Sequence, residues 1–361
     1  LCSGEGPLTQ RFREMDVPVT YGTFPFFSKR RPWEYWGVIL SYVRLMRRWR
    51  IGLVHVNCDR AVPHMVLAGR LARVPVLCHI HDMTRAWFLP RYVRYLNRSA
   101  RIIADSQATA RHCLAAGMDK HKIQVIYECF EMERFANWTK EARRQLRAEW
   151  GIMPQEVAIG LVGQVLRHKG HEEFIRAAVL VVKEFPATRF VIVGDDALSS
   201  DKDFLPFLRG LVLELGLSSH VLFAGYREDI PRVMASLDII TVPSWAEPFG
   251  RVAVEALASR RPVVATKAGG IPEIVEDGVT GLLVPPKDPE ALAQALLRLC
   301  RDPDLRARMG RLGPATARRF DVTEHARQFE QTYEAILKGH LETLPKVPFG
   351  MPSWLPEMEK Q

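Results

Sequence analysis

Short apolar runs alternate with helical stretches along most of the chain, and this alternation constrains the fold more than any other feature. The runs are rich in Val and Ile, as is typical of buried parallel strands. Alternation of this kind predicts parallel sheets with helices on both faces, an α/β fold. The predicted strands are Val17–Thr23, Leu53–Asn57, Val74–His81, Arg101–Ser106 and Ile123–Tyr127, followed by Val157–Val162, Arg189–Val193, Val221–Ala224, Ile239–Val242, Val263–Ala265 and Leu282–Val284.

A chain of 361 residues is long enough for two such domains. We place the first at 1–135, a linker helix at 136–152, the second domain at 153–320 and an irregular, proline-rich tail at 341–361. No window approaches 18 uncharged apolar residues, so no transmembrane helix is expected. Six scattered cysteines without a CxxC pair indicate reduced thiols and a cytoplasmic location.

Charge is distributed unevenly. Residues 1–120 hold 19 Lys+Arg and 8 Asp+Glu, a net of +11, whereas the remainder holds 31 and 33, a net of −2. A basic half points to an anionic partner, for which a membrane surface, a phosphorylated acceptor and nucleic acid are the candidates. No known nucleic-acid-binding module is present, so we expect no nucleic acid.

Residues 32–50 predict a helix with tryptophans on one side and arginines beside them. A basic amphipathic helix of this kind can lie on an anionic bilayer, which would make the protein peripheral at the inner membrane face. The alternative is a surface helix that packs on its own sheet, with its arginines in water.

Two stretches predict a binding site for an anionic, hydroxyl-rich ligand. In the first, Glu247 and Pro248 are expected to open a helix that carries Glu255, with Pro248 at the first helical position. Carboxylates beside free backbone N–H groups suit a sugar or ribose, and the alternative is a capped surface helix with solvated glutamates. In the second, the loop from Gly163 to Gly170 brings basic side chains to a helix start, which predicts a phosphate site or, alternatively, a solvated basic loop.

The sequence His79-Ile80-His81-Asp82 ends a predicted strand, at the edge where ligands bind in open α/β sheets. We interpret His79 as a core residue that alternation directs away from His81. Because this separates the two imidazoles, a metal site formed by His79, His81 and Asp82 is disfavoured.

The block EPFGRVAVEA, followed by PVVAT, AGGIPEIV and DGVTGLLV, resembles the signature of retaining GT-B glycosyltransferases of family 4. The resemblance covers roughly residues 123 to 300 and is weaker before them. It implies two Rossmann-like domains that face a cleft, with the helix at 321–340 crossing back to complete the first. It also implies a nucleotide-diphosphate sugar as co-substrate, front-side attack on it, and neither a metal nor another cofactor.

Site roles also follow from this resemblance. Glu255 would bind ribose hydroxyls, Lys169 the diphosphate, and Glu247 a sugar hydroxyl, while His81 would face the sugar from the opposite domain. The remaining donor-binding residues implied are Gly163, Gln164 and Arg167, and Phe249, Gly250 and Arg251 through their backbone N–H groups.

The chain departs from the family pattern at three places. Gln164 stands where relatives place Arg, and Glu128 stands where they carry an Asn-Gly turn. The first strand and its glycine-rich loop do not precede Gly4, so we expect a truncated first domain.

The resulting hypothesis is a hexosyltransferase of polysaccharide biosynthesis that uses a UDP-, GDP- or ADP-linked sugar and a glycan or lipid-linked acceptor. The alternative is a catalytically decayed nucleotide- or glycan-binding relative. A nicotinamide dehydrogenase is disfavoured because no GxGxxG follows a predicted strand.

Overall fold

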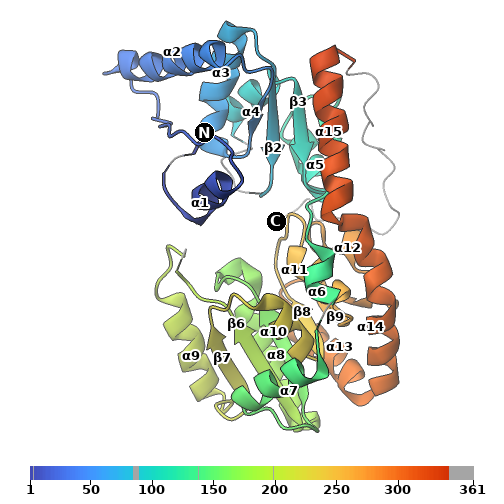
Figure 1. Cartoon of the computed structure of the whole chain (residues 1–361). Helices are drawn as coiled ribbons and strands as arrows, with labels where there is room; N and C mark the ends of the chain where they lie inside the picture. The colour runs from blue at the N-terminus through green and yellow to red at the C-terminus, as the bar shows by residue number, and fades with distance from the viewer. Residues whose placement is uncertain (3, 84–88, 137, 198, 341–361) are drawn as a thin grey trace.

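A computed structural model describes residues 1–2, 4–83, 89–136, 138–197 and 199–340. The predicted tail at 341–361 lies outside the described residues. Two parallel sheets form separate lobes, and the last helix runs beside the first lobe after the chain has left the second (Figure 1). Among the described helices, none is both long and apolar enough to cross a bilayer.

The first sheet has the order β1-β2-β3-β4, with every neighbouring pair parallel. Its strands are β1 (Val54–Val56), β2 (Val76–Ile80), β3 (Arg101–Ala104) and β4 (Ile123–Val125). The helices of this lobe are α1 (Pro7–Glu14), α2 (Pro32–Arg48), α3 (Val62–Ala72), α4 (Pro90–Leu96) and α5 (Gln107–Ala115), with the 3₁₀ turn η1 at Asp59–Ala61. Four of the five strands predicted for this half are confirmed.

The predicted strand Val17–Thr23 is wrong. The segment forms only an isolated parallel bridge between Cys2 and Tyr21. Two backbone hydrogen bonds hold it, from Cys2 N to Thr20 O and from Gly22 N to Cys2 O, each 2.9 Å. Its apolar composition predicts a strand, but a strand needs a ladder, and one bridging residue provides none.

The second sheet has the order β10-β9-β8-β5-β6-β7, again all parallel. Its strands, all six of them predicted, are β5 (Val157–Val162), β6 (Thr188–Val193), β7 (Val221–Gly225), β8 (Ile239–Val242), β9 (Val263–Thr266) and β10 (Gly281–Val284). After β7 the chain crosses back to the other side of β5, so strand order reverses between β5 and β8. In doubly wound sheets ligands bind at such a reversal, outside the carboxyl ends of the strands.

Alternate residues of these strands enter two separate cores. Ile159 and Phe190 pack beneath α8 (His171–Glu184), α9 (Phe204–Glu214) and α13 (Pro289–Arg301). Ala158 and Val191 pack on the other face with α10 (Ile230–Ser236) and α11 (Arg251–Ala258). Both faces are therefore covered, which explains why these strands read as continuous apolar runs rather than as an apolar–polar alternation.

The connection between the lobes differs from the single helix predicted at 136–152. It contains α6 (Met132–Ala136) and α7 (Lys140–Glu149). The side chain of Thr139 accepts a hydrogen bond from Ala142 N and caps α7, so a new helix starts there.

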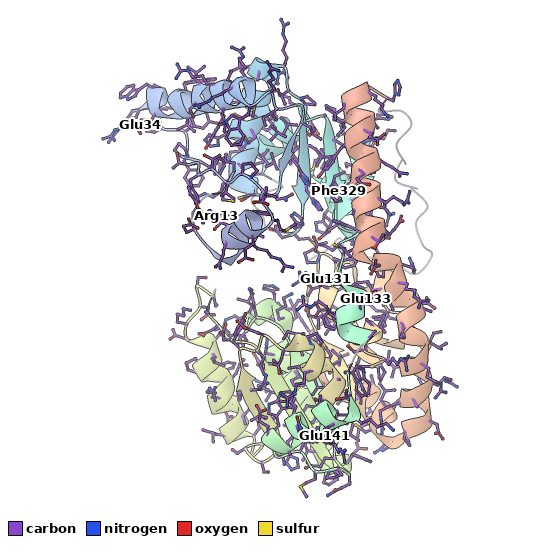
Figure 2. All side chains as sticks on the ribbon, viewed as in Figure 1. Arg13, Glu34, Glu131, Glu133, Glu141 and Phe329 are labelled. Carbon is purple, nitrogen blue, oxygen red and sulfur yellow. The ribbon has the colours of Figure 1, made fainter. Side chains whose placement is uncertain are left out.

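The last elements of the described part of the chain are α14 (Pro303–Ala317), the 3₁₀ turn η3 (Arg318–Phe320) and α15 (Val322–Lys338). Helix α15 crosses back to the first lobe, where Phe329 and Ile336 pack on Leu77 and Ile103. Figure 2 shows Phe329 on the side of α15 that faces the strands of this lobe. Residues 77 and 103 belong to the sheet face opposite α2 and α3, so α15 covers a face that would otherwise be exposed.

Asp238 joins α7 to the start of β8. It accepts hydrogen bonds from Arg143 (2.6 Å), Arg147 (2.9 Å) and the backbone N–H of Ala158 (2.8 Å). Burial alone would raise the pKa of Asp238, but the two guanidinium groups and the N–H outweigh it and hold that pKa below its usual value. This stabilisation is therefore present at neutral pH and is lost as the pH falls through the lowered pKa.

We expect Asp238→Asn to lower the free energy of unfolding by about 3 kcal/mol, because two arginines lose their counter-ion while Arg147 stays buried. Urea denaturation measures this. The matched control is Glu184→Gln, which removes the ion pair between Glu184 and Arg301, both about half exposed, and should cost less than about 1 kcal/mol. Equal losses in the two variants would contradict the structural role of Asp238.

Candidate functional site

Three loops meet at the carboxyl ends of β5, β8 and β9. Two glycines with positive φ allow the contact. Gly170, with φ of 75°, ends the loop after β5, and a Cβ there would lie 2.1 Å from the carbonyl oxygen of Pro243. Gly269, with φ of 57°, follows β9, and a Cβ there would lie 1.8 Å from the carbonyl oxygen of Glu247. A side chain at either position would push these loops apart.

Lys169 and Glu247 form an ion pair where the loops meet. The ammonium Nζ of Lys169 donates to both carboxylate oxygens of Glu247, at 3.0 and 2.8 Å, and Ser244 Oγ donates to one of them at 2.9 Å. The side chains remain 27% and 12% exposed, so solvent still reaches the pair. The η2 turn (Arg167–Lys169) presents the lysine.

The predicted helix start at Glu247 is wrong, because α11 begins at Arg251. Gly250 precedes it with φ of 111°, and the carbonyl of Glu247 accepts a hydrogen bond from Gly270 N at 2.8 Å. Pro248 is therefore not at the first helical position. Glu247 lies in the loop before the helix, and only Glu255 lies on it.

Glu255 occupies the second turn of α11, and its side chain is 12% exposed. Burial raises the pKa of Glu255 to about 7, although the positive charges of Arg251 and Arg134 act to lower it. Arg251 Nε lies 3.4 Å from the Glu255 carboxylate. The backbone N–H groups of Phe249, Gly250 and Arg251 donate to no acceptor within the described part of the chain. The predicted binding of a ligand by these groups requires them to be available in this way.

Of the other residues predicted to bind phosphate, Gly163 and Gln164 lie in the loop that carries Lys169, whereas Arg167 is turned away from it. Gly163 lies at the end of β5 with φ of 148°, and Gln164 beside it is exposed. Arg167 instead pairs with Asp201, at 2.6 Å, and its guanidinium lies 4.6 Å above the ring of Phe204. Both contacts hold Arg167 toward α9.

On the first lobe, His81 Nδ1 lies 2.9 Å from Glu128 Oε1, in a hydrogen bond. The sequence marked Glu128 as a departure from the family but gave it no role. Burial would raise the pKa of Glu128, but the hydrogen bond and charge of His81, with the charge of Arg251, hold it below the usual value. Glu128 is thus a partner of the predicted sugar-facing histidine.

The predicted separation of His79 from His81 is wrong. Their ring centroids lie 3.7 Å apart. Residues two apart in a strand share a face, so alternation places both rings on the side of β2 that faces α15. The ring centroids of Phe329, on α15, and His79 lie 5.2 Å apart. His79 is 2% exposed, and burial holds its pKa below the usual range.

Two side chains, Ser106 and Glu273, join the lobes by hydrogen bonds. Ser106 Oγ accepts a hydrogen bond from Thr109 N and so caps α5, and it also donates to Pro248 O at 2.6 Å. Glu273, on α12 (Ile271–Ile274), accepts hydrogen bonds from Gln107 N at 2.9 Å and Ala108 N at 2.8 Å. A carboxylate at a helix N-terminus is favourable. Sequence reasoning missed this role, although Glu273 lies in the quoted AGGIPEIV.

Family models match nearly the whole of the two lobes. "Glycosyltransferase Family 4" matches residues 1–134, and "Glycosyl transferases group 1" matches residues 142–315.

Named relatives are D-inositol 3-phosphate glycosyltransferases. That of Corynebacterium kroppenstedtii is 35% identical over 229 residues, which are 61% of this chain and 50% of the relative. That of Nocardia farcinica is 32% identical over 296 residues, 80% of this chain and 62% of the relative. The chain thus spans about half to three-fifths of their length.

Solved structures resemble the chain over most of its length. The Anabaena protein Alr3699/HepE, in complex with UDP, superposes with a TM-score of 0.82 at 28% identity, over 92% of this chain and 90% of that one. Its complex with UDP-glucose gives a TM-score of 0.81 over the same shares. Sucrose-phosphate synthase of Thermosynechococcus elongatus, at 23% identity and a TM-score of 0.73, covers 90% of this chain and 83% of that one and shares the fold. The chain belongs to glycosyltransferase family 4 (glycosyl transferases group 1), and its two lobes have the GT-B architecture.

Proposed function

We propose that this chain is a retaining glycosyltransferase that transfers a hexosyl unit from a nucleotide-diphosphate sugar to a glycan or lipid-linked acceptor. The observation that carries the proposal is the Lys169–Glu247 pair at the strand-order reversal, with Glu255 on the following helix. A UDP-linked hexose is the first donor to test, because the Anabaena protein is described in complex with UDP and UDP-glucose.

In this proposal Lys169 binds the diphosphate. Gly163 and Gln164 belong to the same loop and contact the donor through their backbone. Glu255 accepts hydrogen bonds from the ribose hydroxyls. Charge grows on the departing diphosphate during transfer, and a fixed ammonium stabilises it without reorganisation. Because Lys169 supplies this positive charge, we propose that transfer requires no metal and no other cofactor. Arg167 contributes only if it leaves Asp201.

Glu247 and His81 are assigned to the sugar. The carboxylate of Glu247 would accept a hydrogen bond from a sugar hydroxyl beside the backbone N–H groups of Phe249, Gly250 and Arg251. His81 would approach from the first lobe, and Glu128 is a positioning residue that fixes its ring through the 2.9 Å contact. Retention is decided by the anomeric configuration of the product, read by NMR.

The acceptor is assigned to the basic first lobe. Residues 1–120 carry a net charge of +11, and the names of the curated relatives specify a phosphorylated acceptor. An anionic acceptor, soluble or lipid-linked, fits this charge. We accordingly propose a cytoplasmic enzyme of polysaccharide biosynthesis that binds the inner membrane face through residues 32–50.

The surface of α2 supports that contact. Trp33, Trp36 and Leu40 are 66%, 45% and 46% exposed, while Ile39 and Val43 of the same helix are buried in the first lobe. The alternative, a helix that merely packs on its sheet, accounts for the buried side but leaves the exposed tryptophans unexplained.

A catalytically decayed nucleotide- or glycan-binding protein is the second candidate. Gln164 carries no charge, and Arg167 is engaged with Asp201, so of these three predicted ligands only Lys169 supplies charge to a diphosphate. Binding of UDP without any donor hydrolysis or transfer would favour this candidate.

We expect Glu247→Ala to lower transfer or hydrolysis of UDP-glucose at least about 100-fold, because a preorganised contact to the reacting sugar is lost. UDP affinity should stay within about threefold, since Lys169 remains and no longer has a competing partner. Calorimetry with UDP and a UDP-release assay measure the two effects. The control is Glu228→Ala, an exposed glutamate of the same lobe. Wild-type activity in Glu247→Ala would end this assignment.

We expect UDP binding to depend on pH through Glu255. With a pKa of about 7, its carboxyl is mostly protonated at pH 6 and ionised at pH 8. An ionised carboxylate is the better acceptor for two hydroxyls, so affinity should rise about tenfold from pH 6 to pH 8.

Glu255→Gln should remove this rise and weaken binding about tenfold at pH 8. Titration of the diphosphate itself affects both proteins equally, so the difference between them isolates Glu255. An identical pH profile in the two proteins would exclude Glu255 as the titrating group.

We expect the Trp33→Ala/Trp36→Ala variant to bind phosphatidylglycerol vesicles at least about tenfold more weakly than wild type in sedimentation assays. Phe207→Ala, which removes an exposed aromatic of the second lobe, should bind as wild type does. Binding should weaken with salt. Equal binding of both variants would show that α2 is not the membrane contact.

A further inference from the structure

His79, His81 and Glu128 come together on the first lobe, at the end of β2. Each offers one ligand atom, and these atoms all lie within 4.8 Å of one another. We propose that this triad is a binding site for a divalent transition metal ion of the zinc class, and that the bound ion inhibits the protein rather than acting as its cofactor.

The geometry needs only small adjustments. Ligand atoms around a tetrahedral zinc ion lie about 3.4 Å apart, given metal–ligand distances of about 2.0–2.1 Å. The imidazole of His79 is fixed in the core, whereas the side chains of His81 and Glu128 are 33% and 26% exposed. These two can move toward the buried ring by rotation of their side chains, without a backbone change.

The donor set specifies the class of ion. Two imidazoles and one carboxylate suit Zn²⁺, Ni²⁺ or Co²⁺, whereas Mg²⁺ prefers oxygen ligands. Nε2 of His79 is buried and has no hydrogen-bond partner among the described residues. A buried polar atom of this kind is costly unless something binds it. Three protein ligands leave a fourth coordination position for water.

An ion at this site would engage His81, the residue assigned above to the sugar, and would compete with its hydrogen bond to Glu128. The expected consequence is loss of transfer while the ion is bound. This consequence rests on the proposed function, but metal binding itself does not, so the two are measured separately.

The test uses the whole protein, treated with chelator, and two probes. Zn²⁺ is titrated by calorimetry, and Co²⁺ is followed through its visible d–d absorption. The variants are His81→Ala and Glu128→Gln, both at part-exposed positions, with His121→Ala, an exposed histidine elsewhere on the first lobe, as control. Thermal unfolding checks that each variant folds.

The proposal requires that wild type and His121→Ala each bind one equivalent of Zn²⁺ or Co²⁺. It also requires affinity at least about tenfold weaker in His81→Ala and Glu128→Gln, since even outer-shell changes cost that much. Undetectable binding at millimolar metal, or unchanged affinity in both variants, overturns it. A thiolate-to-cobalt charge-transfer band that disappears in Cys129→Ser also overturns it, because Cys129 adjoins Glu128.

For the inhibition, Zn²⁺ should reduce UDP-glucose turnover in wild type and His121→Ala at concentrations that fill the site, and chelator should restore it. If the protein shows no turnover at all, the proposed function fails while the binding experiment still decides the metal site. Turnover that persists with the site filled would overturn the inhibitory role.

Discussion

β5 and β8 lie side by side at the centre of the second sheet, and the chain builds outward from them in opposite directions. This reversal leaves the loops after the two strands without a helix crossing between them. Lys169 arrives on one loop and Glu247 on the other, and their ion pair is the direct result. Glycines at 170 and 269 let the loops touch, so the site depends on backbone contacts as much as on its charges.

Hydrogen bonds link the two lobes next to this centre. Glu273 from the second lobe binds the backbone N–H groups at the start of α5, and Ser106 of the first lobe donates to Pro248. Helix α15 then crosses to the first lobe and packs on β2, on the face that carries His79. His81 and the loops that carry Lys169 and Glu247 therefore belong to one connected arrangement.

The partners of a buried carboxylate, as well as its burial, set its pKa in this arrangement. Glu255 on α11 and Glu128 on the first lobe are both part-buried carboxylates, yet the pKa of one is raised and that of the other is lowered. The difference follows from partners, since Glu128 has the hydrogen bond of His81 whereas Glu255 has only the more distant charges of Arg251 and Arg134. The same contact places the Glu128 carboxylate beside the imidazoles of His79 and His81.

The sequence by itself determined the α/β class, ten of the eleven predicted strands and the motif that holds Glu247 and Glu255, because buried parallel strands are recognisable from short-range composition. It could not decide that Gly250 delays α11 to Arg251, that Arg167 turns to Asp201, or that Glu273 caps α5. The contacts of Arg167 and Glu273 join residues 34 and 166 positions apart, which only the folded chain brings within hydrogen-bond distance. The pairing of His79 with His81 was within reach of the sequence, since residues two apart share a strand face, whereas Glu128 reaches them only through the tertiary fold.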